Sequence, residues 1–417
     1  MMDAEQAIAA LTRDVPRKPE RWVPITEAHG RVLASPAISP VAVPPLDNSA
    51  MDGFAVRAAD LVAPPTTLMV TTTTYAGDPP AGPVGPGQAV RIMTGAPMPS
   101  AGADAVVKVE DTHIPASHDG TERVEIRVGT TPGGFVRRAG EDIREGEQVL
   151  PAGAEVTAAN LGLLASLGMG RVPVVQRPRV AILSTGDELV RPGQTPRPGQ
   201  IFNSNSFTLL GLVREAGAVP VDCGIAADDL DATRAALREA ASADILITTG
   251  GVSMGDKDWV RTALEAEGAD LWFWKVAVKP GKPAAFGRLG DCRIFGLAGN
   301  PVSCMVGFYQ WVRPVLRLML GDPQPHLAVV DATVAEPIAK RPGRAWLERV
   351  VLERDGAGGL RARRTGSQSS GVLSSMSKAH GLLLLNRAST GVAAGDAVRV
   401  MVLDWSFLRG QDPDYGW

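Results

Sequence analysis

The sequence of 417 residues has few of the groups that mark cysteine- or histidine-based chemistry. Its three cysteines, Cys223, Cys292 and Cys304, stand far apart and form no CxxC pair, and its five histidines form no HxH or HExxH pattern. These absences argue against a disulfide framework and against a zinc or iron site built from cysteine and histidine. An odd number of scattered cysteines instead indicates reduced thiols, so we expect a cytoplasmic protein.

Charge and long apolar runs are also scarce. The net charge is −3, so the chain as a whole has no electrostatic attraction toward nucleic acid or an anionic membrane. No apolar run reaches the length of a bilayer, and the first residues, MMDAEQAIAALTRD, are too charged for a signal peptide. We therefore expect neither a nucleic-acid partner nor a membrane partner.

The composition is that of a globular protein with many turns. The chain is 45% hydrophobic and 21% charged, and it contains 46 glycines and 33 prolines. A chain this long predicts roughly three domains or a few more. So much glycine and proline predicts short strands joined by turns rather than a helical bundle.

The pattern changes along the chain. Short helices are expected over 4–13, 25–34 and 157–169, and residues 46–146 alternate short β-type runs with turns. From residue 179, apolar strands alternate with helices, which predicts βαβ units and a doubly wound parallel sheet covered on both faces. After residue 325 the runs predict a small β-barrel. The fold class is therefore multidomain, α/β plus β.

Four segments of the α/β region are expected at one edge of its sheet. They are STGDEL at 184–189, TTGGVSMGDKD at 248–258, KPGKP at 279–283 and GLAGNPVS at 296–303. In a doubly wound sheet, ligands bind beyond the carboxyl ends of the strands, and each of these segments is placed at such an end.

The polar residues of these segments suit a phosphate and a divalent metal ion. They supply the carboxylates of Asp187, Glu188, Asp256 and Asp258, the ammonium groups of Lys279 and Lys282, and the hydroxyls of Ser184, Thr185, Thr249, Ser253 and Ser303. Backbone amides at Gly250 and Gly251 can hold phosphate oxygens, and oxygen ligands suit Mg²⁺. Each loop alone is explained as a structural turn, but four loops at one edge favour a ligand site.

The β-rich region carries a second polar cluster. It consists of DNSAMDG at 47–53, TGAPMP at 94–99 and GEDI at 140–143. An Asx turn with Gly53 at positive φ explains the first segment structurally, and a solvated turn explains the last. Neither segment indicates chemistry by itself.

Taken in order, these motifs carry a resemblance. The set DNSAMDG, TGAPMP, GEDI, STGDEL, GQIFNSNS, TTGGVSMGDKD, KPGKP and GNPVS resembles the MoeA family of molybdopterin molybdenumtransferases, to which the gephyrin E domain is similar. The resemblance runs over nearly the whole chain. It implies insertion of molybdate into adenylylated molybdopterin, release of AMP with the help of Mg²⁺, and an elongated homodimer.

The resemblance also implies a layout in four parts. The α/β part, similar to molybdopterin adenylyltransferases, is expected over 1–26 and 175–325, and a small linker domain over 27–45 and 147–174. The β-rich inserted lobe is expected over 46–146, and the C-terminal β-barrel over 326–417.

Site residues follow from the resemblance position by position. At the pterin and phosphate side it places Glu188, Asp228, Asp256 and Asp258, with Glu188 or Asp256 at the Mg²⁺. Facing the phosphate and the tetrahedral oxyanion it places Lys275, Lys279, Lys282 and Ser303. From the inserted lobe of the partner subunit it brings Asp52, Thr94 and Asp142, and at the molybdate end Arg349 and Ser370. Gly186, Asn300 and Pro301 are the remaining substrate-binding positions. Asp228 is also explained as a helix cap.

Two other functions fit parts of the pattern. A molybdopterin adenylyltransferase would consume ATP by itself and would not need the lobe or the barrel. A dimeric scaffold would only bind, although the retained acids and lysines argue against that role. Tungstate in place of molybdate is a further alternative. The expected partners are a second copy of the chain, the adenylyltransferase and molybdoenzyme acceptors.

Overall fold

The computed structural model describes residues 1–116, 120–251, 259–355 and 358–409. The chain divides into two compact units. The first contains Met1–Trp22, Gly30–Ala34 and Pro173–Trp417, and the second contains Val23–His29 and Ser35–Val172. This division splits both segments of the expected linker domain between the units, so the four-part limits stay a prediction. Within the described ranges, no helix has the length and apolarity needed to span a bilayer.

A six-stranded sheet forms the centre of the first unit. In spatial order its strands are β16 (Val219–Ala226), β13 (Arg179–Thr185), β17 (Ile245–Thr249), β21 (Cys292–Leu297), β20 (Pro283–Leu289) and β18 (Asp270–Lys275). The first four are parallel, as predicted, whereas β20 and β18 are antiparallel to their neighbours. The predicted parallel sheet is therefore mixed, because β20, which the sequence did not predict, runs against its two neighbours. A two-residue turn joins β20 to β21, and a parallel pair would need a long crossover.

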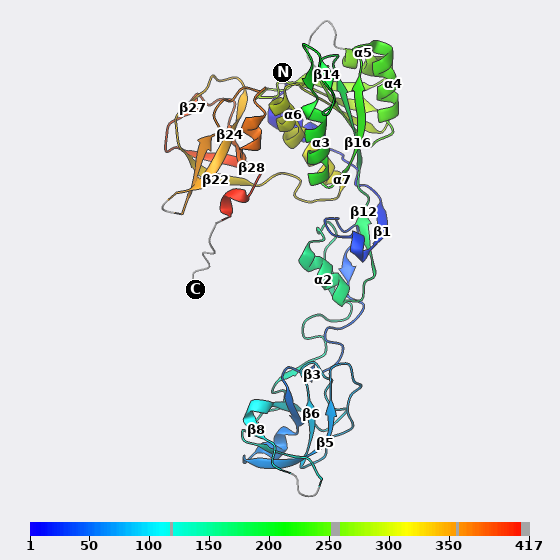
Figure 1. Ribbon diagram of the computed structural model, residues 1–417, viewed down its shortest axis with the longest axis vertical. Helices are drawn as coiled ribbons and strands as arrows, with labels where there is room; N and C mark the ends of the chain where they lie inside the picture. The colour runs from blue at the N-terminus through cyan, green and yellow to red at the C-terminus, as the bar shows by residue number, and fades with distance from the viewer. Residues whose placement is uncertain (117–119, 252–258, 356–357, 410–417) are drawn as a thin grey trace. The chain divides into compact units, whose positions relative to one another are not determined.

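Helices cover both faces of this sheet, as predicted for a doubly wound fold. Along β13, Val180 and Ile182 pack toward α1 (Ala4–Thr12), α3 (Ser204–Glu215), α6 (Pro301–Gly307) and α7 (Arg313–Met319). Ala181 and Leu183 pack toward α4 (Leu230–Ala240) and α5 (Trp259–Ala266), which Figure 1 shows on the other side. Successive strand residues point to opposite faces, and each fully buried aliphatic side chain stabilises the fold by about 1.5–3 kcal/mol.

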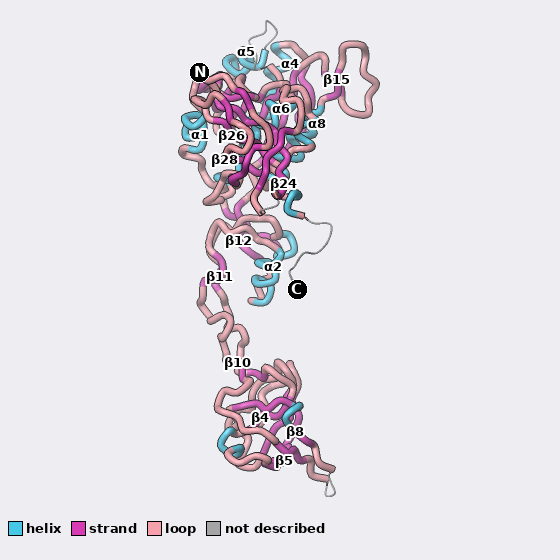
Figure 2. The backbone as a smooth tube through the Cα atoms, turned by 90° about the vertical axis from the view of Figure 1, so that its left-hand side faces the viewer, coloured by secondary structure: helices cyan, strands magenta, loops and turns pink. Residues whose placement is uncertain are grey.

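A closed five-stranded barrel follows in the same unit, which confirms the predicted C-terminal barrel. Its strands pair in the circuit β22 (Val329–Val334), β25 (Leu360–Arg364), β24 (Ala345–Arg354), β26 (Gly381–Leu385), β28 (Ala397–Val402) and back to β22. Figure 2 shows β24, β26 and β28 side by side. The short strand β19 (Val278–Lys279) pairs in parallel with the start of β24 and so ties the barrel to the α/β part.

The second unit contains the predicted β-rich lobe. Its sheet has the order β7 (Ala105–Lys108), β4 (Gly53–Val56), β6 (Gln88–Ile92), β5 (Thr66–Thr74), β9 (Arg123–Ile126) and β8 (Thr112–His113). Both faces are apolar, because Phe54 and Val56 enter one core and Ala55 enters another. The predicted helix over 157–169 is present as α2 (Ala158–Ser166), whose cap Thr157 accepts a hydrogen bond from the Asn160 amide.

The helix predicted over 25–34 is wrong. Only a 3-10 turn, Ile25–Glu27, forms there, because Gly30 has φ +67° and leaves the helical region. Ala34 then donates its amide to the Pro173 carbonyl. The other short strands and the last α-helix of the described ranges are β1 (Glu20–Pro24), β2 (Ala37–Ile38), β3 (Asn48–Ser49), β10 (Val136–Arg137), β11 (Gln148–Leu150), β12 (Arg171–Val175), β14 (Leu189–Val190), β15 (Ile201–Phe202), β23 (Ile338–Ala339), β27 (Gly391–Val392) and α8 (Ser374–Ser377).

Candidate functional site

The central strands of the α/β sheet end together. Ser184 of β13 pairs with Thr249 of β17, and Thr249 pairs with Leu297 of β21, so the three strands finish in one row. β20 runs the other way, and its second residue, Ala284, pairs with Leu297. KPGKP therefore reaches the same edge, but at the start of an antiparallel strand rather than at the end of a parallel one.

The loops at this edge touch through glycine. Gly250 has φ +88°, and a Cβ there would lie 2.7 Å from the Thr185 carbonyl oxygen. Gly251 has φ +63°, and its Cβ would lie 2.4 Å from Cγ2 of Val260. Only glycine combines this backbone conformation with such close approach. The double glycine therefore brings the loop after β17 against the loop after β13.

Two asparagines beneath the edge bind hydroxyls that the sequence assigned to the substrate. Nδ2 of Asn203 donates to Oγ of Ser184 at 3.0 Å, and Ser184 also shares a 2.8 Å hydrogen bond with Ser206. Nδ2 of Asn205 donates to Oγ1 of Thr249 and to the Gly299 carbonyl, both at 2.8 Å. Ser184 and Thr249 are buried, and these hydrogen bonds hold α3 against the edge.

The acidic residues of the first loop are exposed, as a ligand site requires. Asp187 and Glu188 follow β13 after Gly186, and the Glu188 carboxylate lies against Gly186, where a Cβ would come within 2.5 Å of it. Oδ1 of Asp187 accepts the Asp228 amide at 3.1 Å, and Oδ2 of Asp228 accepts the Asp187 amide at 3.4 Å. Asp228 is not the helix cap, because Asp229 caps α4.

The described acids fit a magnesium ion that shares its ligands with a phosphate. No group of three potential metal-binding side chains occurs in the described ranges, so this part of the chain holds no all-protein cage. Mg²⁺ ordinarily takes one or two carboxylates together with substrate phosphates, and exposed Asp187 and Glu188 supply that number. The predicted residues Ser253, Asp256 and Asp258 lie outside the described residues.

A cationic cavity of about 500 Å³ lies where KPGKP, the start of α6 and the barrel meet. Its lining includes the predicted residues Lys279, Lys282, Asn300, Ser303 and Ser370. Arg344, which the sequence reading missed, lines it as well. Three cationic side chains and the hydroxyls of three serines around one cavity are suited to a small anion.

Lys279 is partly buried, whereas Lys282 is exposed. Its Nζ lies 3.5 Å from the centroid of the Trp346 ring, within the range of a cation–π contact. Burial lowers the pKa of the Lys279 ammonium, and nearby arginines act in the same direction against the opposing effect of Glu348. Lys275 ends β18, where its carbonyl accepts the Met2 amide, and it is not among the residues that line this cavity.

Arg349 does not line the cavity either, although the resemblance placed it at the molybdate. Its side chain is buried, with an exposed fraction of 1%. Its guanidinium donates to the carbonyls of Ser367 and Ser369 and to the hydroxyl of Ser375. Burial lowers the pKa of Arg349 from its ordinary high value, and the side chain stays a donor to the protein itself.

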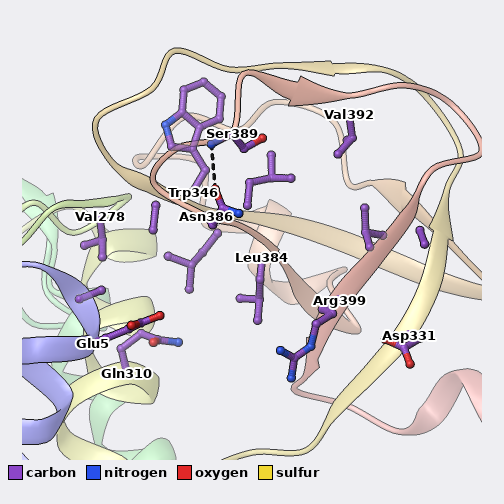
Figure 3. Close-up of a pocket in the computed structure, with 16 residues that line it drawn as sticks. Glu5, Val278, Gln310, Asp331, Trp346, Leu384, Asn386, Ser389, Val392 and Arg399 are labelled. Carbon is purple, nitrogen blue, oxygen red and sulfur yellow. Dashed lines mark hydrogen bonds between the residues drawn. The ribbon is translucent and has the colours of Figure 1, made fainter.

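A second cavity, of about 530 Å³, lies between α1 and the barrel. Figure 3 shows the Trp346 ring beside Asn386 and Ser389, with Leu384 below them. Val278 and Trp346 line this cavity, and Val278 also lines the cationic one. The second cavity is mainly apolar, and none of the predicted site residues lines it.

In the second unit, two of the three predicted residues lie together. Oδ1 of Asp52 accepts hydrogen bonds from the amide and the hydroxyl of Thr94, both at 2.7 Å, and these bonds lower the pKa of Asp52. Asp142 is exposed in the GEDI turn, and its amide donates to Val43. Gly53 lacks the expected positive φ and lies in β4, where a Cβ would meet the Val107 carbonyl at 2.0 Å.

Comparison with known families covers most of the chain. Residues 2–168 match "MoeA N-terminal region (domain I and II)", residues 181–318 match "Probable molybdopterin binding domain", and residues 331–403 match "MoeA C-terminal region (domain IV)".

Individual relatives match over nearly their full length. The chain is 37% identical to a molybdopterin molybdenumtransferase of Haemophilus influenzae, covering 96% of this chain and 98% of that one. It is 42% identical to molybdopterin molybdenumtransferase 2 of Mycobacterium tuberculosis, covering 91% and 94%. Among solved structures, the molybdopterin biosynthesis moeA protein from Pyrococcus horikosii superposes with a TM-score of 0.84 at 29% identity, covering 96% and 99%.

Proposed function

Because this chain belongs to the MoeA family of molybdopterin molybdenumtransferases, we propose that it inserts molybdate into adenylylated molybdopterin and releases AMP in a Mg²⁺-dependent step. The observation that carries the proposal is the cationic cavity beside the glycine loop. The cavity offers charge for a small oxyanion, and the loop offers backbone amides for a phosphate. Both lie at the edge where the central strands end.

The residues of this chain suit the positioning of the oxyanion and the neutralisation of its charge. Lys279 and Lys282 present ammonium groups, and Ser303 and Ser370 present hydroxyls. Together these groups suit a tetrahedral dianion, because compact ammonium charges do not require the planar two-oxygen geometry that an arginine side chain matches. Cleavage of a pyrophosphate needs orientation and neutralised charge more than a protein nucleophile. When bound at Asp187 and Glu188, Mg²⁺ would neutralise charge on the phosphate oxygens.

We also propose that the working form is a cytoplasmic homodimer. In the inserted lobe, the carboxylate of Asp52 is fixed by Thr94, and Asp142 is exposed, so the lobe presents acidic groups at its surface. Symmetric pairing would let one subunit's lobe complete the site of the other. The molybdopterin adenylyltransferase and the acceptor molybdoenzymes are the expected functional partners.

The test is AMP release by the purified chain from adenylylated molybdopterin, with and without molybdate, Mg²⁺ and a chelator. The proposal predicts release that requires both molybdate and Mg²⁺. Release unaffected by the chelator would contradict the metal dependence. A parallel reaction with ATP and molybdopterin separates the alternatives, because an adenylyltransferase would consume ATP and a scaffold would be inert in both reactions.

A further inference from the structure

The start of α3 carries two buried asparagines, and each is bonded to a different part of the sheet edge. Nδ2 of Asn203 donates to the hydroxyl of Ser184 at 3.0 Å, at the end of β13. Asn205 donates instead to Thr249, which ends β17, and to Gly299, which lies in the loop after β21. The two side chains therefore support different loops of the same edge.

A single nitrogen atom of Asn205 makes both of its contacts. Nδ2 lies 2.8 Å from Oγ1 of Thr249 and 2.8 Å from the carbonyl oxygen of Gly299. A carbonyl oxygen can only accept a hydrogen bond, so the amide must turn its NH₂ group, with both hydrogens, toward these two atoms. Asn205 is 8% exposed and Thr249 is 2% exposed, so the bond between them is shielded from water.

The two loops that Asn205 joins are also in direct backbone contact. Thr249 immediately precedes Gly250, whose amide donates to the Leu297 carbonyl at 3.3 Å. A Cβ at Gly299 would lie 3.7 Å from Cα of Gly250, so the two backbones touch. Asn205 thus fastens together, from the side of α3, two loops that already meet at the edge.

A cysteine of α6 completes this buried contact. The Thr249 hydroxyl accepts from Asn205, which leaves its own hydrogen for the sulfur of Cys304, and that bond opposes the effect of burial on the pKa of Cys304. The amide thus donates to the hydroxyl and the hydroxyl to the sulfur, so every hydrogen has an acceptor. The contact therefore links α3, β17 and α6 at one point.

Phosphate binding at a glycine loop depends on the orientation of the backbone. Amide hydrogens that converge on a phosphate attract it, whereas a carbonyl oxygen that faces it repels it. The bond from Asn205 turns the Gly299 carbonyl toward α3 and fixes the spacing between the glycine loop and the loop after β21. Loss of the Asn205 amide would release both loops at once, whereas loss of the Asn203 amide would release only the loop after β13.

We propose that Asn205 is a positioning residue for the nucleotide phosphate and that it acts by fastening the glycine loop to the loop after β21. Asn203 has no part in this contact and supports the loop after β13. The inference rests on the proposed function, because that function supplies the nucleotide. Neither asparagine needs to touch the substrate.

The experiment compares Asn205→Ala with Asn203→Ala, the matched control, because both remove a buried amide from the start of α3. Thr249→Val removes one of the two acceptors with almost no change in shape, and Thr249→Ser keeps the hydroxyl. AMP binding is measured by calorimetry at saturating Mg²⁺. Amide hydrogen exchange is followed over 246–251 and 297–303, and the urea midpoint records stability.

Asn205→Ala should weaken AMP binding about tenfold and speed exchange in both segments. Asn203→Ala should leave AMP binding and both segments as in the parent, at a similar loss of stability. Thr249→Val should lie between the parent and Asn205→Ala, and Thr249→Ser should bind AMP as the parent does. Adding Thr249→Val to Asn205→Ala should weaken binding no further, because both changes remove the same bond.

Equal AMP affinities of the Asn203 and Asn205 variants would overturn the inference, because both would then act through stability alone. Unchanged exchange over 297–303 in Asn205→Ala, or a parent that binds no AMP, would also overturn it. If Asn205→Ala does not fold, an unchanged AMP affinity in Thr249→Val overturns it. A parent that binds AMP in this pattern but releases none from adenylylated molybdopterin contradicts only the proposed function, so the two failures are distinguishable.

Discussion

Replacing Lys282 by glutamine removes the most accessible cation of the anion cavity. Lys282 is exposed and separated from Lys279 by Pro280 and Gly281, so its stem is fixed close to the cavity while its ammonium stays solvated. Glutamine keeps a similar length and hydrogen-bonding ability but carries no charge. The change therefore tests the charge rather than the shape of the site.

The size of the effect follows from Coulomb's law. A unit charge about 4 Å from a dianion is worth ~2 kcal/mol in water and ~8 kcal/mol at an effective dielectric constant of about 20. Because Lys282 is exposed, the lower figure applies, and salt screens it further. We expect the molybdate half-saturation to rise by about ten- to thirtyfold in Lys282→Gln, since ~1.4 kcal/mol corresponds to a factor of about ten.

The assay titrates molybdate at a saturating concentration of the adenylylated pterin and follows AMP. The maximal rate and the pterin half-saturation should change less than the molybdate half-saturation, because the charge acts on the anion. Lys378→Gln is the matched control, since Lys378 is also exposed but does not line the cavity. An unchanged molybdate half-saturation in Lys282→Gln would place the anion elsewhere and refute the reasoning.

Three further predictions concern the rest of the molecule. Gly250→Ala would place a Cβ 2.7 Å from the Thr185 carbonyl oxygen and should abolish most AMP release. The control Gly268→Ala, at φ +80° in open space, should cost only about 1 kcal/mol of stability and leave activity intact. Equal activity of the two variants would contradict the account of the loop. Arg238 and Arg234 lower the pKa of Glu267 to about 2, so the stability from this cluster should be present above pH 4.5 and be lost as pH falls toward 2. The measurement is the difference in urea midpoint between the parent and Glu267→Gln as a function of pH. A difference independent of pH over that window would contradict this prediction. Burial raises the pKa of Cys292 and of Cys304 to about 12. In the native protein at pH 8, a thiol reagent should therefore modify the half-buried Cys223 first, and all three thiols should react after denaturation. Rapid modification of Cys304 in the native state would contradict this prediction.

The sequence predicts the parallel strands well because their apolar runs alternate with capped helices. It does not predict β20, because PAAFGRL has a weak strand composition, and only pairing with β21 on one side and β18 on the other selects the extended form. Consequently the sheet was expected to be parallel throughout. KPGKP was predicted at this edge as the end of a parallel strand. It lies there because the antiparallel strand β20 begins at the edge, and the sequence did not predict that strand.

Side-chain roles are harder to predict than positions. Ser184 and Thr249 stand next to the loops, as expected, but tertiary contacts with Asn203 and Asn205 occupy them. The motif GQIFNSNS contained the signal, since two asparagines separated by one serine at a helix start are costly to bury unless they are hydrogen-bonded. No motif pointed to Arg344, because it lies beyond the last quoted segment and reaches the cavity only through the fold.

The most direct test of the central claim is a single-turnover reaction of the purified chain with adenylylated molybdopterin, Mg²⁺ and radiolabelled molybdate. AMP and pterin-bound molybdenum are measured in the same samples over time. The proposed function predicts that both appear at the same rate and in a one-to-one ratio, and that neither appears when molybdate is left out. AMP that forms without molybdate, or molybdenum that binds the pterin without AMP release, would contradict it.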